Sequence, residues 1–147
     1  MLKSKIFTVL LITLSFSVFA GKNPSKKDGT EGIQFFKGTF KEALAKAKKE
    51  NKMVMMDCYT TWCGPCKMLK KQVFVDKSLG DYMNQKYVCI AVDYESGEGL
   101  SVAQQYPVTG YPTLLFMDAS GKVKKTMAGV PPNPIDAVLA MAKKVGK

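Results

Sequence analysis

The stretch DCYTTWCGPCKM, residues 57–68, places two cysteines, Cys63 and Cys66, on either side of a glycine and a proline. It continues an apolar run that begins at Met53, and such a run is typical of a strand buried on both faces. Pro65 suits the first turn of a helix, because the N–H that it lacks would have no partner there. The pair is therefore expected in a strand-to-helix turn at the carboxyl end of the strand, where open α/β sheets place their sites.

Three roles are open to this cysteine pair. A structural crosslink is the first, but closing so short a loop contributes only about 2 kcal/mol in the loop-entropy model. A metal site is the second. Structural zinc needs about four ligands, whereas the sequence offers no histidine and only two further cysteines, Cys58 and Cys89, inside different strands. A soft monovalent metal at the bare pair stays open as an alternative.

Redox exchange is the third role, and each position in the motif favours it. Cys63 would begin a helix, where unpaired backbone N–H groups and the positive end of the helix dipole lower the pKa of a thiol. The thiolate is the attacking species, and Cys66, one turn later, is placed to attack the mixed disulfide that results. Gly64 and Pro65 make a short, rigid link between the two. We therefore expect thiol–disulfide exchange, with clients that carry cysteines.

The composition argues against other chemistry. All 22 basic residues are lysines, and with 12 acidic residues they give a formal net charge of +10. Arginine, the usual bidentate ligand of phosphate and guanine, is absent, so specific nucleic-acid binding is disfavoured. Histidine is also absent from the sequence, which excludes an imidazole base and a histidine metal ligand.

The beginning of the chain has the pattern of a signal peptide. Lys3 and Lys5 precede an apolar run over residues 6–19, and residues 18–20 fit a small-x-small cleavage site. The run is shorter than the ~20 residues of a membrane-spanning helix, so cleavage after Ala20 is expected rather than an uncleaved anchor. Export, here to the periplasm, would place the cysteines where disulfides form. Residues 21–32 are polar and predict a flexible leader before one domain over residues 33–147.

Apolar periodicity and turn residues predict the order β-α-β-α-β-α-β-β-α within this domain. Thr39 and Glu42 have the spacing of a capping box, and Asp76 is expected to cap a further turn. The predicted strands cover residues 33–36, 53–59, 87–93, 112–118 and 122–129; the predicted helices begin near residues 40, 65, 76, 100 and 135. The order predicts an α/β fold with a mixed central sheet flanked by helices on both faces.

The run WCGPCK, residues 62–67, resembles the active-site motif of the thioredoxin family without substitution. The resemblance extends from Ile33 to the C-terminus. Asp57 lies six residues before Cys63, where the family has a buried acid, and GYPTLLF, residues 110–116, resembles the family's loop and strand with a cis-proline, here Pro112. Residues 121 and 129 match late glycines of the family. The lysine-rich helix before Met53 is similar to that of exported bacterial thioredoxin-like thiol:disulfide interchange proteins.

The resemblance implies a thioredoxin fold and a protein-disulfide oxidoreductase with a redox disulfide between Cys63 and Cys66. It implies that Cys63 is the nucleophile, that Cys66 is the resolving cysteine and that Asp57 transfers the proton of Cys66. Clients are expected to bind at Trp62, Gly64, Pro65, Tyr111 and Pro112. No metal or other cofactor is expected, and the protein is expected to be a monomer fed by a membrane electron donor.

The direction of electron flow and the class of function keep alternatives. The Gly-Pro pair between the cysteines resembles that of reducing thioredoxins, whose potential is low, so a reductant is expected. An oxidant or an isomerase of the same fold is the first alternative. A client-binding module without redox turnover, in which the cysteines are incidental, is the second.

Two departures from the family bear on the site. The proline that usually kinks the active-site helix is replaced by Lys71. Cys89 stands where the family has a lysine near the buried acid, so Asp57 is expected to lack a positive partner and to have a raised pKa. Cys58, next to Asp57 in a strand, should point to the opposite face. Cys58 and Cys89 are expected to be buried, inert thiols rather than a second redox couple.

Overall fold

The structure, a computed structural model, describes residues 31–146. The predicted signal peptide over residues 1–20 and nearly all of the predicted leader over residues 21–32 lie outside the described residues. The site described below falls entirely within them.

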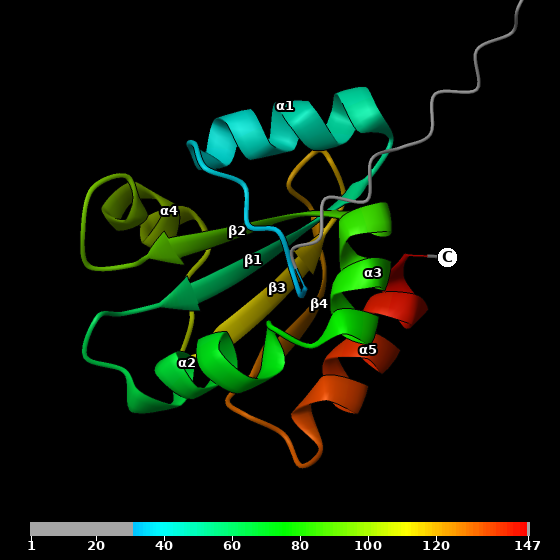
Figure 1. The fold of residues 1–147 in the computed structure, drawn as a ribbon. Helices are drawn as coiled ribbons and strands as arrows, with labels where there is room; N and C mark the ends of the chain where they lie inside the picture. The colour runs from blue at the N-terminus through cyan, green and yellow to red at the C-terminus, as the bar shows by residue number, and fades with distance from the viewer. Residues whose placement is uncertain (1–30, 147) are drawn as a thin grey trace, which may run out of the picture.

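A mixed four-stranded sheet forms the centre of the fold, with the strand order β2-β1-β3-β4. β1 (Met53–Tyr59) pairs in parallel with β2 (Tyr87–Asp93) and antiparallel with β3 (Thr113–Met117), which pairs antiparallel with β4 (Val123–Ala128). Helices cover both faces of this sheet (Figure 1). They are α1 (Phe40–Glu50), α2 (Gly64–Met68), the π-helix η1 (Leu69–Val73), α3 (Lys77–Lys86), α4 (Gly99–Gln105) and α5 (Pro134–Val145). The predicted α/β fold class is confirmed.

The predicted edge strand over residues 33–36 is reduced to a single bridge. Phe35 pairs with Cys89 of β2, and the N–H of Phe36 donates to the carbonyl of Cys89 at 2.7 Å. The beginning of the segment is bonded to a different element, since the N–H of Ile33 donates to the carbonyl of Phe74 at 2.7 Å. These bonds tie the segment to the end of η1 instead of extending the ladder, and they place Phe35 near the candidate site.

The central strand β1 sends alternate side chains to two cores. Met55 belongs to the core formed with η1, α3 and α5, whereas Met56 and Cys58 belong to the core formed with α1 and α4. Asp57 shares the parity of Met55, so its carboxyl lies on the side of the helix that follows the cysteine pair. The prediction that Asp57 and Cys58 face opposite sides of the sheet is confirmed.

The helix that follows the cysteine pair contains a π turn near Lys71, the position at which the resemblance implies a proline kink. α2 continues directly into η1, and the N–H of Phe74 donates to the carbonyl of Leu69, five residues earlier, at 2.9 Å. A π turn inserts one extra residue into a helix and is frequent at functional sites. Here it keeps Leu69, Val73 and Phe74 all buried, while Lys71 takes the family's proline position without a break in the helix.

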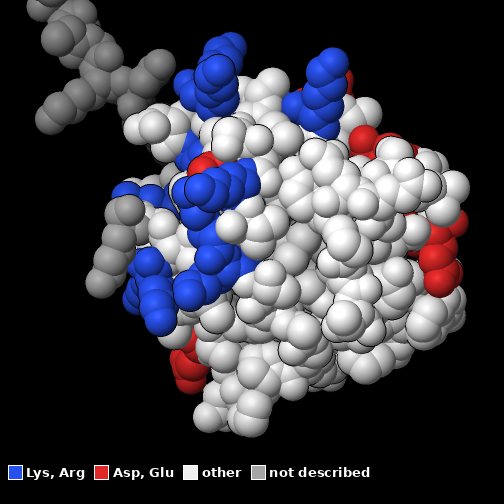
Figure 2. All heavy atoms as spheres, turned by 180° about the vertical axis from the view of Figure 1, so that it is seen from behind, with Lys and Arg blue, Asp and Glu red and all other residues white. Residues whose placement is uncertain are grey.

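Charge is distributed unevenly over the surface. Figure 2 shows one face, on which lysines gather toward one side and a broad neighbouring area carries no charged side chain. Among the described residues, no helix has both the length and the apolar character needed to cross a membrane.

Candidate active site

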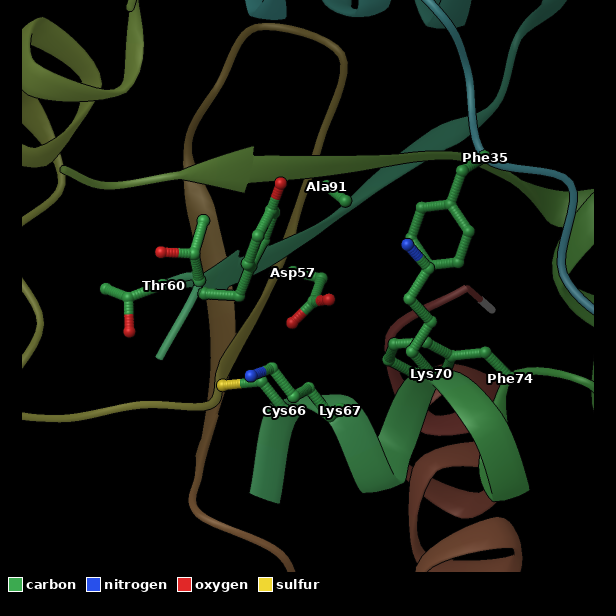
Figure 3. Close-up of a pocket in the computed structure, with 10 residues that line it drawn as sticks. Phe35, Asp57, Thr60, Cys66, Lys67, Lys70, Phe74 and Ala91 are labelled. Carbon is green, nitrogen blue, oxygen red and sulfur yellow. The ribbon is translucent and has the colours of Figure 1, made fainter. Parts of the chain in front are cut away.

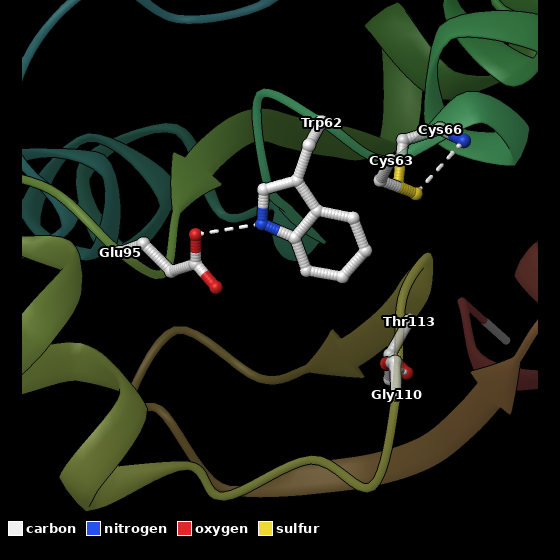
Figure 4. The surroundings of a disulfide bond; sticks show 6 residues. All are labelled: Trp62, Cys63, Cys66, Glu95, Gly110 and Thr113. Atoms are coloured by element: carbon white, nitrogen blue, oxygen red, sulfur yellow. Dashed lines mark hydrogen bonds between the residues drawn. A yellow bond between two sulfur atoms is a disulfide. The ribbon is translucent and has the colours of Figure 1, made fainter.

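Cys63 and Cys66 form a disulfide at the start of α2, with Cα atoms 5.4 Å apart. Cys63 is the N-cap residue, and its Sγ accepts a hydrogen bond from the backbone N–H of Cys66 at 3.1 Å (Figure 4). Pro65 occupies the first turn, as predicted. The Cys63 sulfur therefore lies at the N-terminus of the helix and accepts from a backbone N–H there, an arrangement that in general stabilises a thiolate when the bond is reduced.

Trp62 lies beside the disulfide and is held by the loop that follows β2. Its side chain is 65% exposed, yet the indole Nε1 donates a hydrogen bond of 2.8 Å to Oε2 of Glu95 (Figure 4). Glu95 belongs to the loop that follows β2, and the sequence did not predict its contact with Trp62.

Tyr111 joins this exposed surface to the interior. Its ring packs edge-on against Trp62, with centroids 6.1 Å apart, and against Tyr94, with centroids 5.9 Å apart. The peptide bond between Tyr111 and Pro112 is cis. The hydroxyl of Thr113 donates to the carbonyl of Gly110 at 2.7 Å and closes this loop. The residues predicted to bind clients are thus brought together around the disulfide.

Asp57 lies behind the disulfide and is 5% exposed. Its Oδ1 is buried and has no hydrogen-bond partner within the described part of the chain. The hydroxyl oxygen of Thr60 is likewise buried and has no partner among the described residues. Burial raises the pKa of Asp57 to about 7, while the positive charge of Lys70 lowers it. The expectation of a raised pKa is confirmed.

Asp57 faces a pocket of about 400 Å³. Figure 3 shows the carboxyl between Cys66 on one side and the side chain of Lys70, which reaches toward Phe35, on the other. The walls are formed mainly by aromatic and aliphatic groups. The lining residues are Phe35, Asp57, Tyr59, Thr60, Thr61, Cys66, Lys67, Lys70, Phe74 and Ala91.

The expectation that Asp57 lacks a positive partner is wrong. In the parallel register, Asp57 lies opposite Ala91, whereas Cys89 lies opposite Met55, one pair further along the same face. The positive group comes from η1 instead, because Lys70 lines the same pocket as Asp57. Alignment along β2 could not show this, since the lysine lies on a different element.

The remaining cysteines, Cys58 and Cys89, are unpaired and buried, as predicted. The Cys58 thiol donates to the hydroxyl of Tyr94 at 3.1 Å, and that hydroxyl donates to the carbonyl of Tyr106 at 3.0 Å. Burial raises the pKa of Cys58 to about 12 and also raises the pKa of Cys89. The two thiols face different cores, so they do not form a pair. The described residues contain no group of three or more side chains suited to a metal ion.

Comparisons with known proteins agree with this geometry. The thioredoxin-like domain family matches residues 40–143. Thiol:disulfide interchange protein DsbD of Pseudoalteromonas atlantica is 32% identical over 84 residues, which are 56% of this chain but only 14% of that protein. Chloroplastic thioredoxin Y of Oryza sativa is 26% identical over 124 residues, which are 84% of this chain and 71% of that protein.

Solved structures support the same assignment. A solution structure of a candidate disulphide-isomerase from Bacteroides thetaiotaomicron is 41% identical, with a TM-score of 0.65, and the match covers 80% of this chain and 94% of that one. A thioredoxin from Thermus thermophilus, 23% identical with a TM-score of 0.67 and coverage of 78% and 87%, shares the fold. The family match over most of the chain and the Cys63–Cys66 disulfide lead to one conclusion: the chain belongs to the thioredoxin-like family of thiol–disulfide oxidoreductases.

Proposed function

We propose that the protein is exported and reduces disulfides of client proteins with the Cys63–Cys66 dithiol. The observation that carries the proposal is the difference between the two sulfurs. The Cys63 sulfur caps the N-terminus of α2, whereas Cys66 lines the pocket that holds the buried Asp57 carboxyl. One sulfur is thus placed to be a thiolate, and the other is placed next to a proton acceptor.

The exchange has two steps. The Cys63 thiolate attacks one sulfur of the client disulfide, and the other client sulfur leaves as a thiolate that takes a proton from solvent. Cys66 then gives its proton to Asp57 and attacks Cys63, which releases the second client sulfur. Two electrons pass from the protein to the client, and the protein is left with the Cys63–Cys66 disulfide that the structure contains.

The client would lie against the surface made by Trp62, Tyr111 and Pro112. Trp62 and Tyr111 offer aromatic contact beside the sulfurs, and the surface at Gly64 is open, because a Cβ added there meets no atom within 4 Å. Gly64 and Pro65 then let the client backbone come close to Cys63. An extended client segment could add its backbone to this loop, a mode of binding that tolerates many client sequences.

Reduction is the favoured direction because of the Gly-Pro pair between the cysteines, which resembles that of reducing thioredoxins. Similarity to part of DsbD, a thiol:disulfide interchange protein, supports exchange of disulfides with other proteins. The pattern of the first 20 residues supports export, which we place in the periplasm, and there a membrane protein is proposed to supply the electrons. The active unit is proposed to be a monomer.

The redox equilibrium of the pair against a glutathione series tests the direction. A potential near the −270 mV of thioredoxin supports a reductant, whereas a value near the −120 mV of DsbA would contradict it. Catalysis of insulin reduction by dithiothreitol tests turnover, with Cys63→Ser as the inactive control. If insulin reduction is no faster with the native protein than with Cys63→Ser, the chain is a binding module and not an exchange enzyme.

Isomerisation is the second candidate, because the Bacteroides thetaiotaomicron relative is described as a candidate disulphide-isomerase. Recovery of active ribonuclease from its scrambled disulfide form would distinguish it. An isomerase should need Cys63 but tolerate Cys66→Ser, because isomerisation begins and ends at the first sulfur. A reductant should lose its activity in both variants.

Export has a separate test. The full chain, expressed in a bacterium with a periplasm, should yield a mature protein that begins at Gly21. Mass spectrometry of the periplasmic fraction measures this directly. A protein that keeps residues 1–20 and stays with the membrane would show an uncleaved anchor.

A further inference from the structure

Lys70 occupies an unusual place in the candidate active site. It follows Cys66 by four residues, so the two side chains lie on the same face of the helix, and both line the Asp57 pocket. The backbone of Lys70 lies within the π turn of η1. The side chain is exposed overall, but it reaches across the pocket toward Phe35 (Figure 3).

The groups around Asp57 leave few other sources of charge. Lys67 and Lys70 are the only cationic residues among those that line the pocket, and Asp57 is the only acidic one. The rest of the lining is uncharged and consists of Tyr59 from β1, Thr60 and Thr61 directly after it, Cys66 from α2, Ala91 from β2, and Phe35 and Phe74. Cys89 lies on the same face of β2 as Ala91 but two residues before it, opposite Met55 and not opposite Asp57. The wall of β2 is therefore uncharged next to Asp57, and the charge comes from the helix.

We propose that Lys70 is a positioning residue for the second step of exchange, in which its ammonium group at the pocket holds the Asp57 carboxyl in the ionised form that can accept the proton of Cys66. The inference rests on the proposed function. Burial alone favours the neutral carboxyl, because a charge in an apolar pocket loses its hydration. A cation at the mouth of the same pocket opposes that effect through a medium less polar than water.

The step balances without any further reactant. Before it, the client is bound to Cys63 through a mixed disulfide and Cys66 carries a thiol proton. The proton moves to Asp57, the Cys66–Cys63 bond forms, and the bond between Cys63 and the client sulfur breaks. The client leaves as a thiolate. Asp57 then returns its proton to solvent.

Lys71 provides a matched control. It is the next residue, of the same type, and it is also exposed. It does not line the Asp57 pocket; it lines a neighbouring surface hollow with Lys67, Lys70 and Val75. Replacing either lysine with methionine removes one charge from the same part of the surface. A difference between the two variants therefore reports the position of Lys70 and not the net charge of the protein.

The experiment follows the reaction of the reduced protein with an aromatic disulfide whose released thiolate is coloured. The first attack, by Cys63, releases one thiolate, and the second, by Cys66, releases the other. In Lys70→Met the second phase should reach half its maximal rate about half a pH unit higher than in the native protein. Below that midpoint the second phase should be about threefold slower, while the first phase changes less.

Three further measurements keep the proposal testable. Lys71→Met should match the native protein, and Lys70→Arg should restore the native midpoint, because it keeps the positive charge. A carbon-13 NMR titration of the Asp57 carboxyl should show the same upward shift in Lys70→Met without any reaction. Equal second-phase midpoints in the Lys70→Met and Lys71→Met variants, or an unchanged NMR titration, would overturn the role of Lys70.

Failure of the proposed function would give a different result. If the protein does not carry out two-step exchange, the native protein itself would release a single thiolate, as Cys66→Ser must. If exchange is intact but Lys70 has no role, the native protein shows both phases and Lys70→Met leaves them unchanged.

Discussion

The indole of Trp62 is hydrogen-bonded to Glu95, at 2.8 Å from Nε1 to Oε2, and these residues come from different loops. Trp62 directly precedes Cys63, and Glu95 lies in the loop after β2. The bond holds an aromatic ring that is 65% exposed. It therefore fixes the orientation of the most exposed apolar group next to the disulfide.

We predict that Glu95→Ala loosens Trp62 without unfolding the domain. An exposed hydrogen bond to a charged group contributes about 1 kcal/mol or less, so the melting temperature should hardly change. Trp62 is the single tryptophan of the chain, so its fluorescence anisotropy reports the ring alone and should fall. Glu95→Gln keeps an acceptor oxygen and should keep most of the anisotropy. Unchanged anisotropy in Glu95→Ala would show that Tyr111 holds the ring without help.

The order of reaction of the two cysteines should follow their positions. In the reduced protein, Cys63 should be alkylated by iodoacetamide at a lower pH than Cys66, because the N-terminus of α2 stabilises the Cys63 thiolate. Mass spectrometry of peptides after brief labelling across a pH series measures both sites. Faster labelling of Cys66 near neutral pH would reverse the proposed roles of the two residues.

Burial of Asp57 should make stability depend on pH. Its pKa is raised to about 7 in the folded protein, against roughly 4 in an unfolded chain. Between those values the folded state holds a proton that the unfolded state has lost, so the free energy of unfolding falls as the pH rises. The full effect is on the order of 4 kcal/mol above pH 7.

Asp57→Asn should remove that dependence. The free energy of unfolding of the native protein should fall between pH 5 and pH 8, whereas that of Asp57→Asn should not, because asparagine has no charge to bury. The stability of the variant relative to the native protein should therefore be greater at pH 8 than at pH 5. Denaturant unfolding of the oxidised protein at the two pH values measures the gain, and a comparison between pH values cancels the cost of the new amide. A gain of the same size at both pH values would contradict an ionisable Asp57 in this range.

The close approach of Gly99 to the end of β2 gives another prediction. A Cβ added there would lie 1.7 Å from the carbonyl oxygen of Asp93, whereas the space around Gly97 is open. Gly99→Ala should therefore displace the loop that carries Glu95 and cost roughly 1–3 kcal/mol or more. Gly97→Ala, strained only by its φ of 56°, should cost less. Thermal unfolding of the two variants compares them directly.

The sequence predicted the sheet and the cysteine turn because both depend on local patterns. The apolar runs correspond to β1 and β2, and Thr39 and Glu42 form the expected capping box. The placement of Lys70 beside Asp57 was missed because the positive partner was expected on β2, whereas Lys70 lies on the helix, four residues after Cys66. The reduced pairing of residues 33–36 was missed for a related reason, since the backbone bond of Ile33 to Phe74 joins segments far apart in the chain.

The last prediction concerns the surface that receives the client. Tyr111 packs edge-on against both Trp62 and Tyr94, so its ring supports the exposed indole and also forms part of the surface beside Cys63. In a Cys66→Ser background, which stops the reaction at the mixed disulfide, Tyr111→Ala should weaken the trapping of disulfide-containing clients severalfold. Tyr111→Phe keeps both ring contacts and should trap clients nearly as well as tyrosine. Non-reducing gels of trapped complexes measure yield and rate, and a thermal melt of each variant checks that the domain is folded. If a folded Tyr111→Ala protein traps clients at an undiminished rate, the client does not bind across this ring, and the loop of Pro112 only supports the sheet.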